Sequence, residues 1–275
     1  MALPTLDNLL RRSAYLTIGM LVVWIGLDTW LTGTAWAGLP LSQSALTVEY
    51  CEFNHVHRFV HQPSNTYSNL VYFFLGVLIL QIAQVDTQKG GETGLNRLEH
   101  FPLLSALMGG CFVYLGFGSA FFHASLTYIG QRVDMNATYS LMLTLAGIAL
   151  YHLGHRMSLT AAQKKGWVLM ILLLIGAFFK LSLLVPSSRL VPALILGINV
   201  LMLIDYIQFR NDRSLGLLLL GLGLIVVAIK IRTLDVQKVN CDPYAFFQGH
   251  AFWHVLTGLS SFCSYSFFRF TRITS

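Results

Sequence analysis

The sequence predicts an all-α protein, a polytopic bundle of about eight transmembrane helices. Of its 275 residues, 55% are hydrophobic and only 11% are charged, whereas soluble domains carry roughly 25% charged residues. The mean hydropathy is +0.63. Apolar windows of about 20 residues, the length that crosses a bilayer, recur along the whole chain. These observations exclude an ordinary soluble globular domain and a disordered chain.

Eight apolar windows are bounded by polar or turn residues, and each predicts one helix. They span residues 15–37, 66–85, 101–124, 132–152, 167–185, 190–209, 214–231 and 248–268. The first window follows Arg11 and Arg12 and is long enough for a retained helix. Its end at 35–37 reads Ala-Trp-Ala, which resembles a signal-peptide cleavage site, so removal of this segment is the alternative.

The basic residues predict how the helices are oriented. The net charge of +6 could indicate a nucleic-acid ligand, but Lys and Arg lie in short stretches between helices and form no patch with aromatic residues. We therefore expect no nucleic-acid partner. Eleven Lys and Arg residues fall on one side of the predicted topology and six on the other. Because basic loops stay on the cytoplasmic side, both termini are predicted to be cytoplasmic.

Three predicted helices carry polar groups that are costly to place in a membrane. The third helix ends with Ser119 and His123, the fourth begins near Asp134, and the eighth begins with His250 and His254. In the predicted topology all of them lie at the same outer depth. Ionisable residues within membrane segments are functional more often than not, so the sequence predicts one shared site there.

The spacing of these residues favours a metal-dependent hydrolase. His250 and His254 are four residues apart and share one helical face. With His123 they would form a three-histidine zinc site, the usual ligand number when a fourth position is left for water. Asp134 would accept the proton of that water, and Ser119 would donate a hydrogen bond to the developing oxyanion.

Each residue also has a plainer interpretation. The spacing of two histidines is weak evidence by itself, because His57 and His61 repeat it. His123 could be solvated or cap a helix, Asp134 could be an N-terminal charge that the helix dipole favours, and Ser119 could bond to the carbonyl group four residues earlier. Only the set as a whole favours a site.

Taken in order, these motifs resemble those of the alkaline ceramidases, which belong to a superfamily of seven-helix membrane hydrolases that includes adiponectin-receptor-like proteins. Residues 49–54 (Glu-Tyr-Cys-Glu-Phe-Asn), 65–69 (Asn-Thr-Tyr-Ser-Asn) and 250–259 strengthen the resemblance, which covers roughly residues 48–268. It implies a zinc-dependent intramembrane amidase that hydrolyses ceramide or a similar N-acyl sphingoid lipid to a fatty acid and a sphingoid base. The zinc, base and oxyanion roles would fall on the residues named above.

The resemblance also implies a division of the chain. Residues 1–40 would hold a cytoplasmic N-terminus and one additional transmembrane helix, and residues 41–275 would form the seven-helix ceramidase-like domain. The protein would be a multi-pass integral membrane protein with its active site near the outer face, periplasmic or lumenal.

A calcium site is a further implication of the resemblance. Its ligands would be Glu49, the Tyr50 carbonyl, Glu52, Asn54 and Gln62. The family has a glutamate at the last position, and the neutral amide of Gln62 would weaken binding because calcium affinity rises with ligand charge. The alternative is that Glu52 and Asn54 only cap and anchor the loop.

The four cysteines lack any Cys-x-x-Cys spacing, which excludes a zinc ribbon or a thioredoxin-type motif. Cys51 and Cys241 both precede helices on the outer side, and the family has a comparable bridge, so a disulfide is expected between them. Cys111 and Cys263 lie within predicted helices and are expected to be packing residues.

Other functions stay open at this point. The same chemistry could act on another lipid amide or ester, since the motifs specify the reaction and not the acyl chain or headgroup. A receptor-like membrane protein could keep the site without turnover, although residues 49–54 belong with ceramidases. A transporter with a His and Asp proton relay is disfavoured because the groups cluster at one face and not at the midplane.

Overall fold

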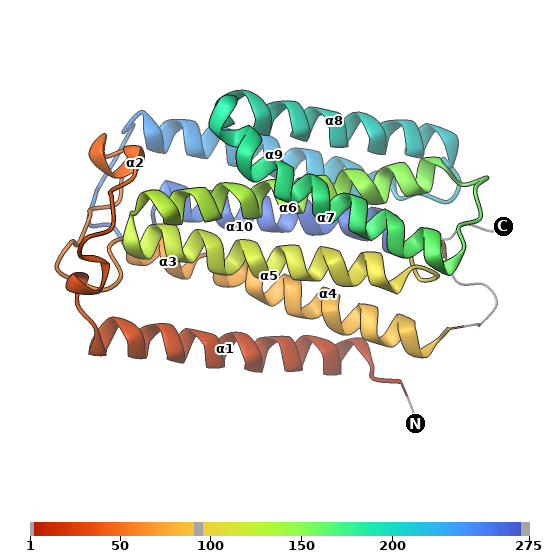
Figure 1. Ribbon diagram of the computed structural model, residues 1–275, viewed down its shortest axis with the longest axis horizontal. Helices are drawn as coiled ribbons and strands as arrows, with labels where there is room; N and C mark the ends of the chain where they lie inside the picture. Colours follow the sequence, from red (N-terminus) through yellow and green to blue (C-terminus); the bar gives the residue numbers. More distant parts are fainter. Residues whose placement is uncertain (1–2, 91–95, 271–275) are drawn as a thin grey trace.

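The computed structural model describes residues 3–90 and 96–270. Over these residues the chain is helical, with two isolated β-bridges and no β-strand. The long helices run side by side along one axis (Figure 1). In chain order the α-helices are α1 (Leu6–Trp30), α2 (Gln43–Leu46), α3 (Pro63–Tyr67), α4 (Leu70–Gln88), α5 (Pro102–Ser125), α6 (Tyr128–Leu153), α7 (Ala161–Leu184), α8 (Ser187–Gln208), α9 (Leu215–Val236) and α10 (Gly249–Arg269).

Within residues 3–90 and 96–270, seven segments are long and apolar enough to cross a membrane. They are α1, the combined span Pro63–Gln88, and α5 to α9. The eighth predicted helix is α10, which packs against α4, α6 and α9. With two histidines and several serines, it lacks a window as apolar as those of the seven spans. The all-α polytopic bundle predicted from the sequence is confirmed.

The first helix differs from its predicted window. It begins at Leu6, because the Thr5 side chain accepts a hydrogen bond from the Asn8 amide and caps it. It ends at Trp30, and Gly33–Trp36 forms a 3-10 turn instead. Asp28, near this end, pairs with Arg58 and accepts the Val60 amide (2.9 Å). These contacts fasten α1 to the loop that precedes α3.

Small residues bring α4 and α5 into backbone contact. A Cβ placed on Gly76 would lie 2.8 Å from the Gly109 carbonyl oxygen, and one on Gly109 would lie 2.9 Å from the Gly76 carbonyl oxygen. Close approach at small residues is how membrane helices gain packing energy without a hydrophobic driving force. The contact fixes α5, whose last turns carry Ser119 and His123.

A tight turn then reverses the chain into α6. Leu126 adopts a left-handed conformation (φ 51°), and the Thr127 side chain caps α6 by accepting the Gly130 amide (3.1 Å). Gly118 lies against Val133 and Ala137. Because α5 and α6 meet so closely here, the end of α5 and the start of α6 form one surface.

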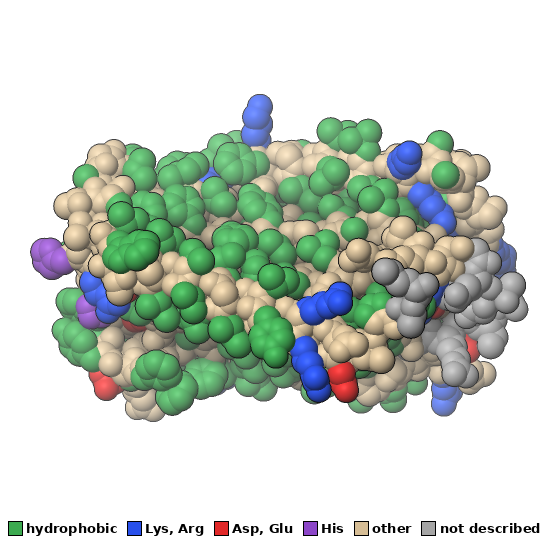
Figure 2. Space-filling view, turned by 90° about the horizontal axis from the view of Figure 1, so that it is seen from below, with side chains coloured by type: hydrophobic (Ala, Val, Ile, Leu, Met, Phe, Trp, Pro, Cys, Tyr) green, Lys and Arg blue, Asp and Glu red, His purple; other side chains and the backbone are tan. Residues whose placement is uncertain are grey.

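The helices differ greatly in burial. About half or more of the spans of α4 (with α3), α5 and α6 is buried, against 11% for α1 and α7 and 22% or less for α8 and α9. Figure 2 shows hydrophobic side chains along the middle of one face, with Lys and Arg more frequent toward the end of the bundle that holds the termini. The apolar exterior suits a lipid environment, and the chain is a multi-pass membrane protein.

Candidate metal centre

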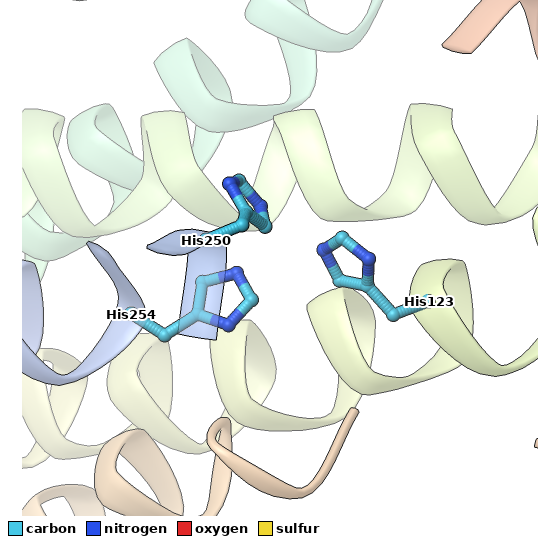
Figure 3. Close-up of side chains that lie close together, drawn as sticks. All are labelled: His123, His250 and His254. Atoms are coloured by element: carbon cyan, nitrogen blue, oxygen red, sulfur yellow. The ribbon is translucent and has the colours of Figure 1, made fainter. Parts of the chain in front are cut away.

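Three histidines meet at one end of the bundle. His123 comes from the last turn of α5, and His250 and His254 come from the first turns of α10. One ligand nitrogen of each lies within 4.8 Å of the others, and all three side chains are buried. Their rings face one another (Figure 3), with centroids 4.6 to 5.1 Å apart.

In His123 and His254, one ring nitrogen makes a hydrogen bond and the other nitrogen is left free for a ligand. His123 Nδ1 lies 2.7 Å from Gln62 Oε1, an acceptor, so Nδ1 carries the proton. His254 Nδ1 lies 2.8 Å from Ser68 Oγ, and that hydroxyl donates to the Asn65 carbonyl, so it accepts from the imidazole. In both rings the proton on Nδ1 leaves the Nε2 lone pair available, as metal-bound histidines require.

These residues fit a zinc ion. His123 Nε2 and His250 Nδ1 are buried and have no hydrogen-bond partner within the described part of the chain. An unpaired buried nitrogen is costly, and a metal ion would satisfy it. Three neutral imidazoles with an open fourth position are a common catalytic zinc set.

Asp134 and Ser119 flank the histidines. Ser119 is buried on α5, one turn before His123, and lies within hydrogen-bonding reach of the half-buried Asp134 on α6. Asp134 also interacts with Tyr50 and Tyr72, whose rings lie against His250 and His254 at 3.9 and 6.2 Å. The structure therefore brings together all five residues that were predicted for the reaction.

Two supporting residues were not recognised in the sequence. The Tyr50 ring packs on His250 and lies 5.3 Å from His123, covering the site from the loop side. Asp235, near the end of α9, accepts the amides of Cys51 (3.2 Å) and His250 (3.3 Å). The role of Asp235 could not be predicted from a local sequence pattern, because Cys51 is 184 residues away and His250 is 15 residues away.

Ser68 and Gln62 carry a weaker sequence signal. Ser68 lies in the stretch 65–69 that resembles ceramidases, but its role beside His254 could not be predicted from the motif. Gln62 was predicted as a calcium ligand. In the structure its side-chain oxygen accepts from His123 and from Asn65 (3.2 Å), and its amide nitrogen donates to Asn54 Oδ1 (2.7 Å).

The other predicted calcium ligands also contact protein donors. Glu49 pairs with Arg232 (3.1 Å) and accepts from the Ser44 hydroxyl. The Tyr50 carbonyl accepts from the Lys238 ammonium group. Glu52 accepts the Ser64 and Asn65 amides (2.6 and 2.8 Å), and burial raises the pKa of Glu52 to about 7. The arrangement agrees with the alternative in which the loop is anchored by its own polar groups.

The predicted disulfide is confirmed. Cys51 and Cys241 are bonded, with their Cα atoms 5.7 Å apart across 190 residues of sequence. The bond ties the loop 49–54 to the segment that leads into α10, next to the histidines. Cys111 and Cys263 are free and buried, as expected for packing residues.

Comparison with known proteins supports the resemblance seen in the motifs. The family model described as Ceramidase matches residues 42–275. Alkaline ceramidase 1 of Mus musculus is 24% identical over 226 residues, which cover 78% of this chain and 75% of the mouse protein. The matched region contains every residue of the histidine site and leaves α1 outside.

Proposed function

Because the chain belongs to the ceramidase family, we propose that it is a zinc-dependent intramembrane amidase that hydrolyses ceramide-like lipids to a fatty acid and a sphingoid base. One observation carries the proposal. Three buried histidines converge next to a carboxylate and a hydroxyl, and two of them have a nitrogen that lacks a partner in the described chain. His123, His250 and His254 would bind the zinc ion.

The chain's own residues would move the protons. Asp134 would accept a proton from water while the water oxygen forms a bond to the amide carbon. It would then give that proton to the amide nitrogen as the carbon–nitrogen bond breaks. Ser119 would donate a hydrogen bond to the carbonyl oxygen, which gains negative charge in the same step. When bound, zinc would act as a Lewis acid toward the carbonyl and the water.

A cavity whose lining includes Trp253, the residue before His254 on α10, suits the hydrocarbon part of a lipid. It measures about 80 Å³ and is lined mainly by apolar side chains, among them Leu141, Ile198 and Trp253. Thr257 lies three residues beyond His254, lines the cavity, and hydrogen-bonds to Tyr72 (2.5 Å). The lining also includes Ser, Thr and Asn residues, so the pocket combines apolar surface with hydrogen-bonding groups, as ligand pockets commonly do. We propose that it receives an acyl or sphingoid chain.

The site would face the outer side of the membrane. The start of α1 and the end of α10 lie at the same end of the bundle, and the histidine-bearing turns lie at the other (Figure 1). With basic residues retained in the cytoplasm, both termini would be cytoplasmic and the site periplasmic or lumenal. We further propose that residues 1–40 contribute one additional helix to a seven-helix catalytic domain, 41–275.

The test is fatty-acid release from a panel of ceramides by the purified protein in detergent. The wild type is compared with Asp134→Asn and with a chelated sample before and after zinc is resupplied. The proposal expects release by the wild type, loss of release in the variant and on chelation, and recovery with zinc.

Other outcomes separate the alternatives. Stoichiometric zinc without cleavage of any ceramide would redirect the search to other lipid amides and esters. Zinc binding without turnover of any lipid would favour a receptor-like protein. Absence of both zinc and turnover would contradict the proposal.

A further inference from the structure

Two side-chain cations hold the loop 49–54 in place. The Lys238 ammonium group contacts the carbonyl oxygens of Glu49 (3.1 Å) and Tyr50. The Arg232 guanidinium group pairs with the Glu49 carboxylate at 3.1 Å. Both cations come from α9 and the turn that follows it, about 180 residues away in the sequence.

We propose that Lys238, together with Arg232, supplies the positive charge that this loop needs, so that the loop folds without a calcium ion. The Lys238 ammonium group donates a hydrogen bond to the Tyr50 carbonyl oxygen, which is one of the oxygens that would bind calcium. Arg232 balances the charge of the Glu49 carboxylate, while the Glu52 carboxylate is bound by the Ser64 and Asn65 amides. The proposal goes beyond the hydrolytic function and does not depend on it.

The remaining oxygens of the loop agree with this arrangement. Glu52 accepts two backbone amides through its two oxygens. Asn54 Oδ1 accepts from Gln62, and Gln62 Oε1 accepts from His123. Gln62 is therefore part of the support of a histidine in the candidate zinc site. A calcium ion would have to replace several of these hydrogen bonds at once.

The backbone conformation of Lys238 supports the proposal independently of the side-chain contacts. Helix α9 ends in a Schellman motif, in which the Lys238 amide bonds to the Asp235 carbonyl (3.1 Å) and the Val239 amide bonds to the Leu234 carbonyl (3.0 Å). The residue at this position adopts a left-handed conformation and is usually glycine. Lys238 has a φ of 58°, so the chain keeps a strained lysine where glycine would fit more easily.

This strain makes Lys238→Gly an informative variant. If the side chain were only an exposed lysine, glycine would relieve the strain and stabilise the protein. If the ammonium group anchors the loop, Lys238→Gly should lower the melting temperature by about 2–4 °C. It should also speed reduction of the Cys51–Cys241 disulfide by dithiothreitol several-fold, because Cys51 follows Tyr50 directly and Cys241 is close to Lys238.

Asn240 provides the matched control. It lies in the same turn with a φ of 54° and is exposed, so Asn240→Gly makes the same backbone change without removing a cation. We expect its melting temperature to equal or exceed that of the wild type, because glycine relieves backbone strain, and its rate of disulfide reduction to match that of the wild type. A Lys238→Gly protein that is equally or more stable, with an unchanged reduction rate, would overturn the proposal.

Calcium itself gives the second arm of the test. The full-length wild type is titrated with calcium chloride to millimolar concentration, and separately treated with EGTA, while the melting temperature and the disulfide reduction rate are followed. The proposal expects neither to change. A saturable rise in melting temperature or a saturable slowing of reduction on adding calcium would overturn it.

Discussion

The two ends of the bundle bury polar groups in different ways. At the end that holds the termini, Arg213 pairs with Asp205 (2.6 Å), and Arg269 pairs with Asp86 (2.5 Å) and Glu99 (3.2 Å). At the other end, three imidazoles face one another, and two of them have a nitrogen without a partner in the described part of the chain.

The paired charges at one end serve the packing of the helices, whereas the histidines at the other end are available to bind a ligand. Charges that pair with each other inside a bundle fix the contacts between helices, and they leave little capacity for a ligand. The Nδ1 protons of His123 and His254 already point to Gln62 and Ser68, so the Nε2 atoms of both rings can only accept. The three histidines together could therefore hold a metal ion. His152, at the end that holds the termini, is also buried with an unpaired Nε2, but it is not part of the histidine group. Convergence, and not burial, distinguishes the candidate metal centre.

The largest effect should come from removing a histidine of the cluster. His254→Ala leaves two ligands, so we expect the purified protein to lose stoichiometric zinc and all detectable fatty-acid release. Metal analysis and a ceramide assay measure both. The matched control is His57→Ala, which removes the exposed member of the other histidine pair with the same spacing and should keep both properties. Full zinc content in His254→Ala would contradict the assignment.

Asp134→Asn should separate chemistry from metal binding. The amide cannot accept a proton, so we expect kcat for ceramide to fall by about 10²–10⁴-fold while the zinc content stays at the wild-type level. Steady-state kinetics with parallel metal analysis would show this. A kcat within a few-fold of the wild type would remove Asp134 from the mechanism.

Breaking an ion pair at the opposite end should affect stability and not the metal. Asp86→Ala removes the fully buried carboxylate from the Arg269 guanidinium and leaves the pair with Glu99. We therefore expect a loss in unfolding free energy below the about 3–5 kcal/mol of a completely broken buried pair. Zinc per folded molecule should stay constant. The double variant Asp86→Leu with Arg269→Met should recover much of the loss. Depletion of zinc in folded Asp86→Ala would show that the two ends of the bundle are coupled, and would contradict a purely structural role for the ion pair.

The smallest effect should come from the residues that orient the histidines. Gln62→Ala removes the acceptor for His123 Nδ1–H, and we expect zinc affinity to fall about 10–100-fold in a titration against a chelator. Gln62→Glu keeps an acceptor at that position and should retain most of the affinity. Equal affinities in all three proteins would mean that this hydrogen bond does not support the site.

Much of this architecture could be predicted from the sequence because it depends on local patterns. Apolar windows predict helices, and the spacing of His250 and His254 places both on one face of α10. The start of the first helix was predicted wrongly because the cap at Thr5 lies before the apolar window. The contacts of Gln62 with His123 and of Asp235 with Cys51 join segments 61 and 184 residues apart. Such pairs follow from helix packing and have no signature in the local sequence.

X-ray absorption at the zinc edge of the purified wild-type protein tests the central claim most directly. A zinc ion held by His123, His250 and His254 should give one zinc per chain with three histidine nitrogens at about 2.0–2.1 Å and one further light ligand. This signal should disappear in His254→Ala. A protein that contains no zinc after zinc loading, or zinc with sulfur ligands, would contradict the account.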